Sequence, residues 1–114
     1  MKTTDAVARL AALAHDSRLE LFRRLVRRGP EGMAAGEIAA ALDIAPPTLS
    51  FHLAHLARTG LVSSRREGRS IVYAADYDAI RELVGYLYEN CCGGAGCAPS
   101  FAAPRAGTEK ASSR

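Results

Sequence analysis

The three cysteines of the chain lie within seven consecutive positions, as Cys91, Cys92 and Cys97. Clustered thiolates bind soft or thiophilic ions, and they can also undergo thiol–disulfide chemistry. Three sulfurs complete the shell of a pyramidal ion such as arsenite or antimonite, whereas a closed structural zinc site takes four ligands. The spacing therefore indicates a three-thiolate ion site, with a redox sensor or a strained vicinal disulfide as alternatives.

Cys91 and Cys92 can converge only if a helix ends at them, since adjacent side chains on a continuing helix point about 100° apart. Gly93-Gly94 is expected to end the helix and to let the chain turn back, because glycine accepts positive φ. Cys97 can then reach the pair, since five residues span at most about 17 Å. The spacing favours a site within one chain, although a ligand from Glu89, water or a partner chain stays possible for zinc.

A redox sensor needs thiols that nearby positive charge activates. No Lys or Arg lies between Arg81 and Arg105, and the end of a helix that precedes the cysteines is the negative end of its dipole. We therefore expect ion binding rather than redox sensing.

Composition indicates one small folded domain. The chain has 114 residues, of which 48% are hydrophobic, and its formal net charge is +3. Residues 1–92 are the expected domain, and residues 93–114, rich in Gly, Ala, Ser and Pro, are an expected flexible tail. No run approaches the roughly 20 apolar residues of a membrane span, and the N-terminus lacks a signal-peptide pattern. We expect a cytoplasmic protein without a membrane partner, whose thiols stay reduced.

Apolar periodicity and turn residues predict a mainly α fold with one β-hairpin. Asp16 or Ser17 is the expected N-cap of the second helix, and Glu67-Gly68 is the expected hairpin turn. The expected helices are 4–14, a second one through residues 19–26 that stops at Gly29-Pro30, and then 34–42, 48–59 and 76–90. The expected strands are 61–65 and 70–74.

The two short helices and the hairpin after them have the pattern of a winged helix-turn-helix. Leu49, Leu53 and Leu56 form one apolar stripe on the second short helix. Its other side is expected to face outward, and such a helix fits a major groove about 12 Å wide. The predicted DNA-contacting residues of this helix are Pro47, Thr48, Ser50, Phe51 and His52.

The hairpin, or wing, adds positive charge through Arg65, Arg66 and Arg69, which we expect to meet phosphates or a minor groove. An exposed hairpin can also carry arginine only for solubility. His52 and His55 are spaced to converge on a metal ion, but no third ligand is close in the sequence, and either can be a packed core histidine.

Three segments, LAALAHDSRLELFRRL (10–25), LSFHLAHLARTGLV (49–62) and REGRSIVYAA (66–75), resemble the ArsR/SmtB family of bacterial metalloregulatory repressors. The resemblance spans about residues 5–92. It implies a homodimeric winged-helix repressor, not an enzyme, that binds double-stranded operator DNA and leaves it when an ion binds. It also implies a dimer interface built from the first and last helices. The matching apolar positions are Val7, Leu10, Ala14, Ile80, Leu83, Val84 and Leu87.

The ion sites of the family differ among its members. The helix before the recognition helix, MAAGEIAAAL, has no cysteine, and no histidine follows His55. Two of the family's known sites are therefore missing, and the three cysteines look like the C-terminal three-thiolate site of some arsenite-responsive members. We expect As(III) or Sb(III) as effector, with no permanently bound cofactor. A cadmium- or lead-responsive repressor and a thiol redox-sensing repressor are the alternatives.

An arsenate-handling thiol reductase and a metal-buffering chaperone are rivals from other classes. A reductase would need a phosphate-cradling loop, which the sequence does not show. A chaperone would not need the Arg-bearing wing or the Ser-x-His helix.

Overall fold

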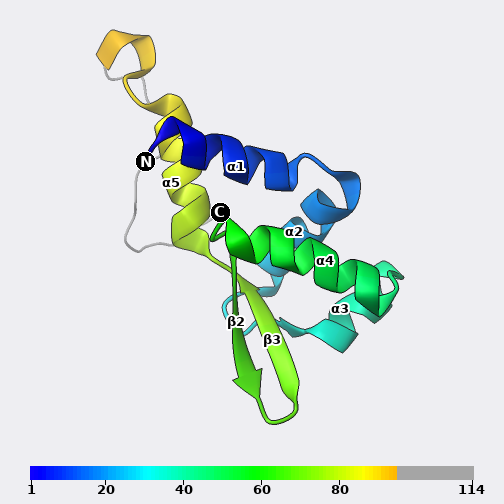
Figure 1. The fold of residues 1–114 in the computed structure, drawn as a ribbon. Helices are drawn as coiled ribbons and strands as arrows, with labels where there is room; N and C mark the ends of the chain where they lie inside the picture. Colours follow the sequence, from blue (N-terminus) through cyan, green and yellow to red (C-terminus); the bar gives the residue numbers. More distant parts are fainter. Residues whose placement is uncertain (95–114) are drawn as a thin grey trace.

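The computed structural model describes residues 1–94 (Figure 1). The predicted fold class, mainly α with a β-hairpin, is confirmed, and a third short strand is added. The elements, in chain order, are α1 (Thr3–Leu13), α2 (Asp16–Arg28), β1 (Met33–Ala34), α3 (Ala35–Leu42), α4 (Pro46–Arg58), β2 (Val62–Glu67), β3 (Ser70–Ala75), α5 (Tyr77–Tyr88) and a 3₁₀ turn (Cys91–Gly94).

The core lies where α2, α3 and α4 meet the base of the sheet. Its members recur at helical spacing, so each helix contributes one apolar face. The largest fully buried side chains are Leu21, Leu25, Ile38, Leu49, Leu53, Leu56 and Leu61. This core holds α4 firmly enough to present its other face.

The three strands form an antiparallel sheet in the order β1-β3-β2. Strand β1 pairs Met33 with Tyr73 and Ala34 with Val72. It is only two residues long, too short for an alternation to be visible in the sequence. The hairpin is also longer than predicted, because Glu67 pairs with Ser70 and the turn falls at Gly68-Arg69.

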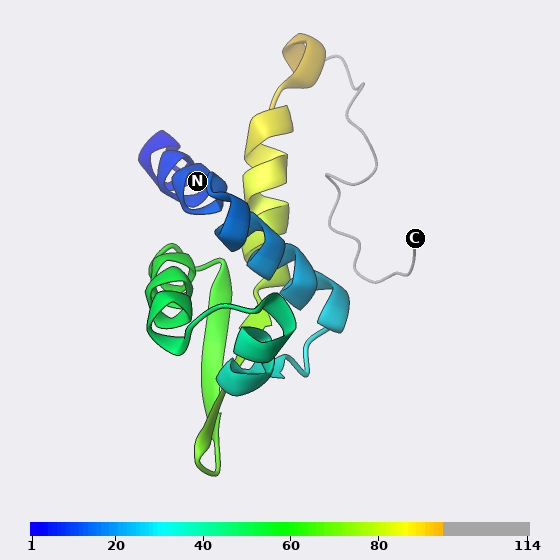
Figure 2. The same cartoon turned by 90° about the vertical axis from the view of Figure 1, so that its right-hand side faces the viewer.

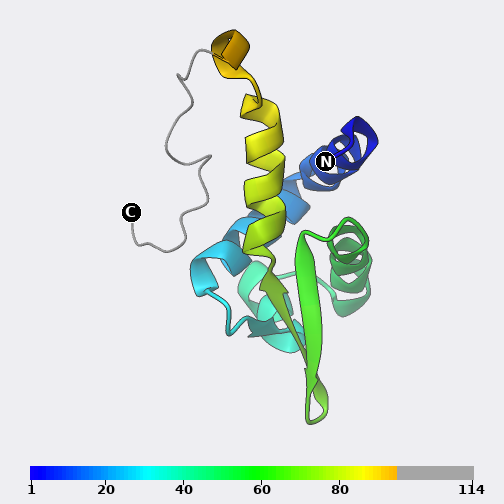
Figure 3. The same cartoon turned by 90° about the vertical axis from the view of Figure 1, so that its left-hand side faces the viewer.

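The wing and the 3₁₀ turn lie at opposite ends of the molecule. Figures 1, 2 and 3 show that α5 extends from the sheet toward the 3₁₀ turn and that the wing projects from the opposite end of the molecule. Helix α1 crosses α5 (Figure 1). A hydrogen bond of 2.5 Å joins the hydroxyls of Thr3 and Tyr86 and so links α1 to α5. Helix α5 therefore connects the 3₁₀ turn to the rest of the fold, and the hydrogen bond from Thr3 holds α1 beside it.

Several helix ends differ from the predictions. The N-cap of α2 is His15, whose Nδ1 accepts the Ser17 N–H at 3.2 Å, and not Asp16 or Ser17. Helix α4 begins at Pro46 rather than Thr48, because proline suits the first turn. Helix α5 ends at Tyr88, before Asn90.

Within residues 1–94, no helix has the length and apolar character needed to cross a membrane.

Candidate DNA-binding surface and cysteine site

Helix α4 has one buried and one exposed face. Leu49, Leu53 and Leu56 are at most 2% exposed. Four of the five residues predicted to contact DNA from this helix are exposed, and these are Pro47, Thr48, Ser50 and Phe51. Pro46 and Pro47 carry no N–H, so the start of α4 offers few backbone donors to a phosphate. The chemistry of this face is therefore that of its side chains.

His52 is the exception, and its predicted outward orientation is wrong. It is 5% exposed, because positions 49, 52, 53 and 56 share one helical face. Its Nδ1 lies 3.4 Å from Nη1 of Arg18, and its ring centroid lies 4.8 Å from that of His15. Burial lowers the pKa of His52, and the nearby charges of His15, Arg18 and His55 lower it further. A buried ring cannot reach a base edge, so His52 supports α4 from within.

His55 is half-buried beside Phe51, with ring centroids 4.9 Å apart in an edge-on arrangement. Desolvation is the main cause that lowers its pKa, followed by the charge of Arg18. Among the residues that the structure describes, no three His, Cys, Asp or Glu side chains are grouped to hold a metal ion. In the described residues, His52 and His55 contact other rings, His52 the ring of His15 and His55 the ring of Phe51.

The three arginines of the wing have different surroundings. Arg65 donates from Nη2 to the carbonyl of Glu31 at 2.7 Å and from Nε to Glu67 at 2.5 Å. It also approaches the carbonyl of Pro30 at 3.5 Å, so it fastens the hairpin to the loop after α2. All three arginines are exposed, but within residues 1–94 only Arg65 among them makes side-chain hydrogen bonds. The guanidinium groups of Arg66 and Arg69 are better placed than that of Arg65 to meet phosphates.

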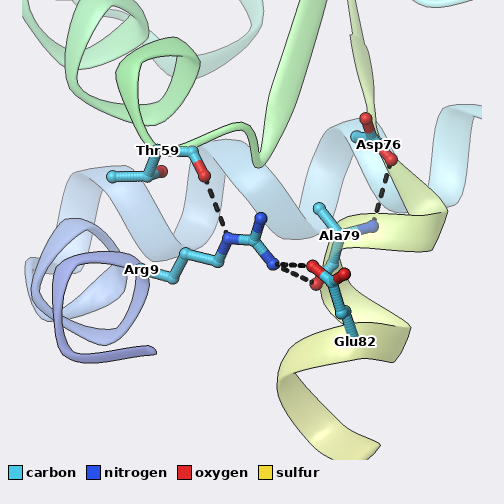
Figure 4. Close-up of polar contacts among 5 residues, drawn as sticks. All are labelled: Arg9, Thr59, Asp76, Ala79 and Glu82. Atoms are coloured by element: carbon cyan, nitrogen blue, oxygen red, sulfur yellow. Dashed lines mark hydrogen bonds and ion pairs between the residues drawn. The ribbon is translucent and has the colours of Figure 1, made fainter. Parts of the chain in front are cut away.

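Arg9 links three helices, a role that sequence reasoning missed (Figure 4). From α1, its Nε donates to the carbonyl of Thr59, the residue that caps α4, at 3.0 Å. Its Nη1 donates to the carbonyl of Ala79 at 3.0 Å and to Oε1 of Glu82 at 2.8 Å, both on α5. The side chain is 16% exposed. The end of α4 is thus tied to α1 and α5 by one guanidinium.

Cys91 and Cys92 follow α5 in a separate turn. Helix α5 ends at Tyr88 because Glu89 is extended, at ψ 128°, and Asn90 is left-handed, at φ 59°. The prediction that Gly93-Gly94 ends the helix is therefore wrong by about one turn. Asn tolerates the left-handed region better than most residues, which explains the break at Asn90. The required end of the helix before the cysteines is confirmed.

The Sγ atoms of Cys91 and Cys92 are 3.7 Å apart. Two sulfurs on one ion lie at most about 4.6 Å apart if each bond is about 2.3 Å, as in zinc thiolates. The pair is thus close enough to share an ion. The same distance excludes a disulfide between these two residues, whose S–S bond would be about 2.05 Å. Cys97 lies outside the described residues.

Cys92 is disulfide-bonded in this structure, in contrast to the expected reduced state. A disulfide sulfur is not a thiolate, so the predicted three-thiolate site would need reduction before an ion could bind.

The predicted interface residues are partly exposed. Val7, Leu10 and Leu87 are 57%, 43% and 58% exposed, large values for apolar side chains. Ala14 is exposed, and Ile80 and Val84 are half-buried. Leu83 is 2% exposed in the single chain, so it belongs to the interior and its prediction as an interface residue is wrong. Three large apolar side chains of α1 and α5 are thus exposed in the single chain.

The class of the protein follows from these features: it is a winged helix-turn-helix DNA-binding protein, with the short helices α3 and α4, an exposed face on α4 and an arginine-bearing wing. A family model described as a helix-turn-helix domain matches residues 13–65. The biofilm growth-associated repressor of Agrobacterium fabrum is 36% identical over 91 residues, which are 80% of this chain and 75% of that protein. The transcriptional activator HlyU of Vibrio cholerae is 30% identical over 90 residues, or 79% of this chain and 81% of that protein.

Solved structures agree with these relatives. An ArsR-like transcriptional regulator from Rhodococcus sp. RHA1 superposes with a TM-score of 0.68 at 25% identity, covering 80% of this chain and 82% of that one. NolR from Sinorhizobium fredii superposes with a TM-score of 0.61 at 33% identity, covering 77% and 85%. The chain belongs to the ArsR/SmtB family of winged-helix transcriptional regulators.

Proposed function

We propose that this regulator is an arsenite-responsive repressor. It binds operator DNA as a homodimer through α4 and the wing, and it leaves the DNA when As(III) or Sb(III) binds the thiolates of Cys91, Cys92 and Cys97. Both a repressor and an activator occur among its relatives, so the sign of the response belongs to the proposal. The observation that carries it is the 3.7 Å pair of cysteine sulfurs placed where α5 has just ended.

We propose that a second copy of the chain covers the exposed apolar side chains of α1 and α5. Val7, Leu10 and Leu87 would otherwise leave a costly apolar area in water on a small domain. A two-fold pairing through these helices would place the two α4 helices one DNA turn apart, as the half-sites of a palindromic DNA site require.

The proposed signal runs from the cysteines through α5 to α4. An ion that ties the 3₁₀ turn together restrains the end of α5, and α5 holds Arg9 through Ala79 and Glu82. Arg9 in turn holds the carbonyl of Thr59 at the end of α4. Coupling between two sites is typically about 1–3 kcal/mol, or about 5–150-fold in affinity, and DNA must weaken arsenite binding by the same factor.

Three sulfurs favour a pyramidal ion over zinc, which takes four ligands in a closed site. Lead also accepts three sulfurs, and cadmium prefers thiolates, so these ions are the nearest competitors. X-ray absorption of the reduced full-length chain loaded with arsenite should show three sulfur neighbours around arsenic. Two sulfurs, or nitrogen and oxygen neighbours, would refute the assignment of ligands.

A thiol redox-sensing repressor is the second candidate, and the disulfide at Cys92 is the observation that favours it. The two candidates differ in what releases DNA from the reduced protein. Peroxide without arsenite should release DNA under the second candidate and should leave it bound under the first.

The wing should contribute charge to DNA binding. The logarithm of the DNA-binding constant falls as the logarithm of the salt concentration rises. We expect Arg66→Ser and Arg69→Ser each to make this slope shallower by about 0.9 for every phosphate that the variant no longer neutralises. Lys2→Ser removes the same charge at the N-terminal end of α1, far from the wing, and should leave the slope unchanged (Figure 1). Fluorescence anisotropy between about 50 and 200 mM salt measures these slopes. Equal slopes for all three variants would show that the wing does not touch DNA.

A further inference from the structure

Phe51 is an unusual side chain on the exposed face of α4. It is 59% exposed, the most exposed of the large apolar side chains in the described part of the chain. Its exposed neighbours on the helix are small, such as Ser50 and Ala54. Phe51 does not belong to the buried core, and an exposed aromatic ring among small residues does not form a broad apolar patch.

The ring of Phe51 contacts two histidine rings of its own helix. Its centroid lies 4.9 Å from that of His55, edge-on, and 5.9 Å from that of His52. Such aromatic contacts are favourable in addition to the area they bury. His52 is itself fixed between His15 and Arg18. These contacts favour one orientation of the Phe51 ring in the protein without DNA.

The charges around Phe51 suit a polyanion. The sequence of α4, PPTLSFHLAHLAR, contains no acidic residue, and its last turn carries His55 and Arg58. The wing arginines Arg66 and Arg69 are exposed as well. A double-stranded DNA is therefore favoured over an apolar protein partner, which would be expected to meet a wider apolar surface.

The major groove displays one apolar group, the C5-methyl of thymine, and phenylalanine is among the side chains that contact it. We propose that Phe51 is a specificity-determining residue that selects thymine by contact with this methyl group. The inference rests on the proposed DNA binding through α4. Burying one methyl is worth about 0.8 kcal/mol, which corresponds to about fourfold in affinity at 1.36 kcal/mol for each factor of ten.

The test begins with selection of preferred duplexes from a randomised library by the full-length chain. Each thymine of a selected duplex is then replaced by deoxyuridine, which lacks only the methyl group. We expect one thymine in each half-site at which the wild type loses about fourfold in affinity. Phe51→Ala should bind the thymine and deoxyuridine duplexes equally at that position, and Phe51→Leu should keep part of the difference.

Leu19→Ala is the matched control, because Leu19 is also an exposed apolar residue, 45% exposed, but lies on α2. It should show the same loss with deoxyuridine as the wild type. The inference is overturned if no thymine is sensitive, or if Phe51→Ala, shown to be folded by circular dichroism, keeps the full sensitivity. A wild type that selects no duplex at all would overturn the proposed function, and this inference with it.

Discussion

Leu56→Ala is expected to lower the free energy of unfolding by about 2–5 kcal/mol, the usual cost of truncating a buried leucine. Leu56 is 0% exposed and belongs to the same core as Leu21, Leu25 and Ile38. Truncation of the Leu56 side chain leaves a cavity between α4 and the rest of the core. The surrounding helices can move in to fill this cavity only in part, because other contacts hold them in place. Urea denaturation of the reduced protein measures the change.

Leu19→Ala provides the comparison, since Leu19 is 45% exposed and its truncation should cost less than about 1 kcal/mol. If Leu56→Ala lowered the free energy of unfolding no more than Leu19→Ala, the packing of α4 against the core would be contradicted. A weakened Leu56→Ala variant should also bind DNA less well in proportion to the fraction that is unfolded. DNA added in excess should therefore restore part of its stability.

Arg9→Met is expected to lower the free energy of unfolding by about 1.5–3 kcal/mol. The methionine keeps most of the apolar stem and removes the three hydrogen bonds. The carbonyls of Thr59 and Ala79 are then without a charged donor at a partly buried position. The cost comes mainly from these two carbonyls, since an ion pair with the exposed Glu82 contributes little.

Glu82→Gln separates the two contributions. It removes the ion pair and keeps both carbonyl contacts, so we expect a cost below about 1 kcal/mol. If Arg9 carries the signal from α5 to α4, Arg9→Met should bind arsenite as the wild type does. Arsenite should then weaken the DNA binding of this variant by a smaller factor than that of the wild type. Equal stability losses in the two variants would show that the carbonyl contacts do not matter. An unchanged arsenite response in Arg9→Met would show that the signal takes another route.

The sequence predicted the elements whose pattern is local. The leucine stripe of α4, the glycine turn of the wing and the apolar faces of α2 and α5 each repeat over a few turns or residues. Strand β1 was not predictable, because two residues carry no period and its pairing with β3 joins positions that are far apart. The ends of the helices were also predicted less well than their middles. The N-cap of α2, for example, is His15 because of a single hydrogen bond, which the sequence pattern does not show.

The site was predicted less completely than the fold. The burial of His52 had a signal, since it lies three residues after Leu49 and four before Leu56. The role of Arg9 had none, because its partners lie 50, 70 and 73 positions away along the chain. Arg65 resembled its neighbours in the sequence, and only its contacts with Glu31 and Glu67 separate it from Arg66 and Arg69.

The affinity for operator DNA with and without arsenite tests the central proposal most directly. The reduced full-length chain and Cys97→Ser are each titrated with a selected duplex, in the presence and absence of arsenite. We expect arsenite to weaken DNA binding of the wild type by about 5–150-fold, and to leave Cys97→Ser bound at the same concentration. An equal release of both proteins, or no release of the wild type, would contradict the claim that three thiolates on one arsenite ion free this regulator from its DNA.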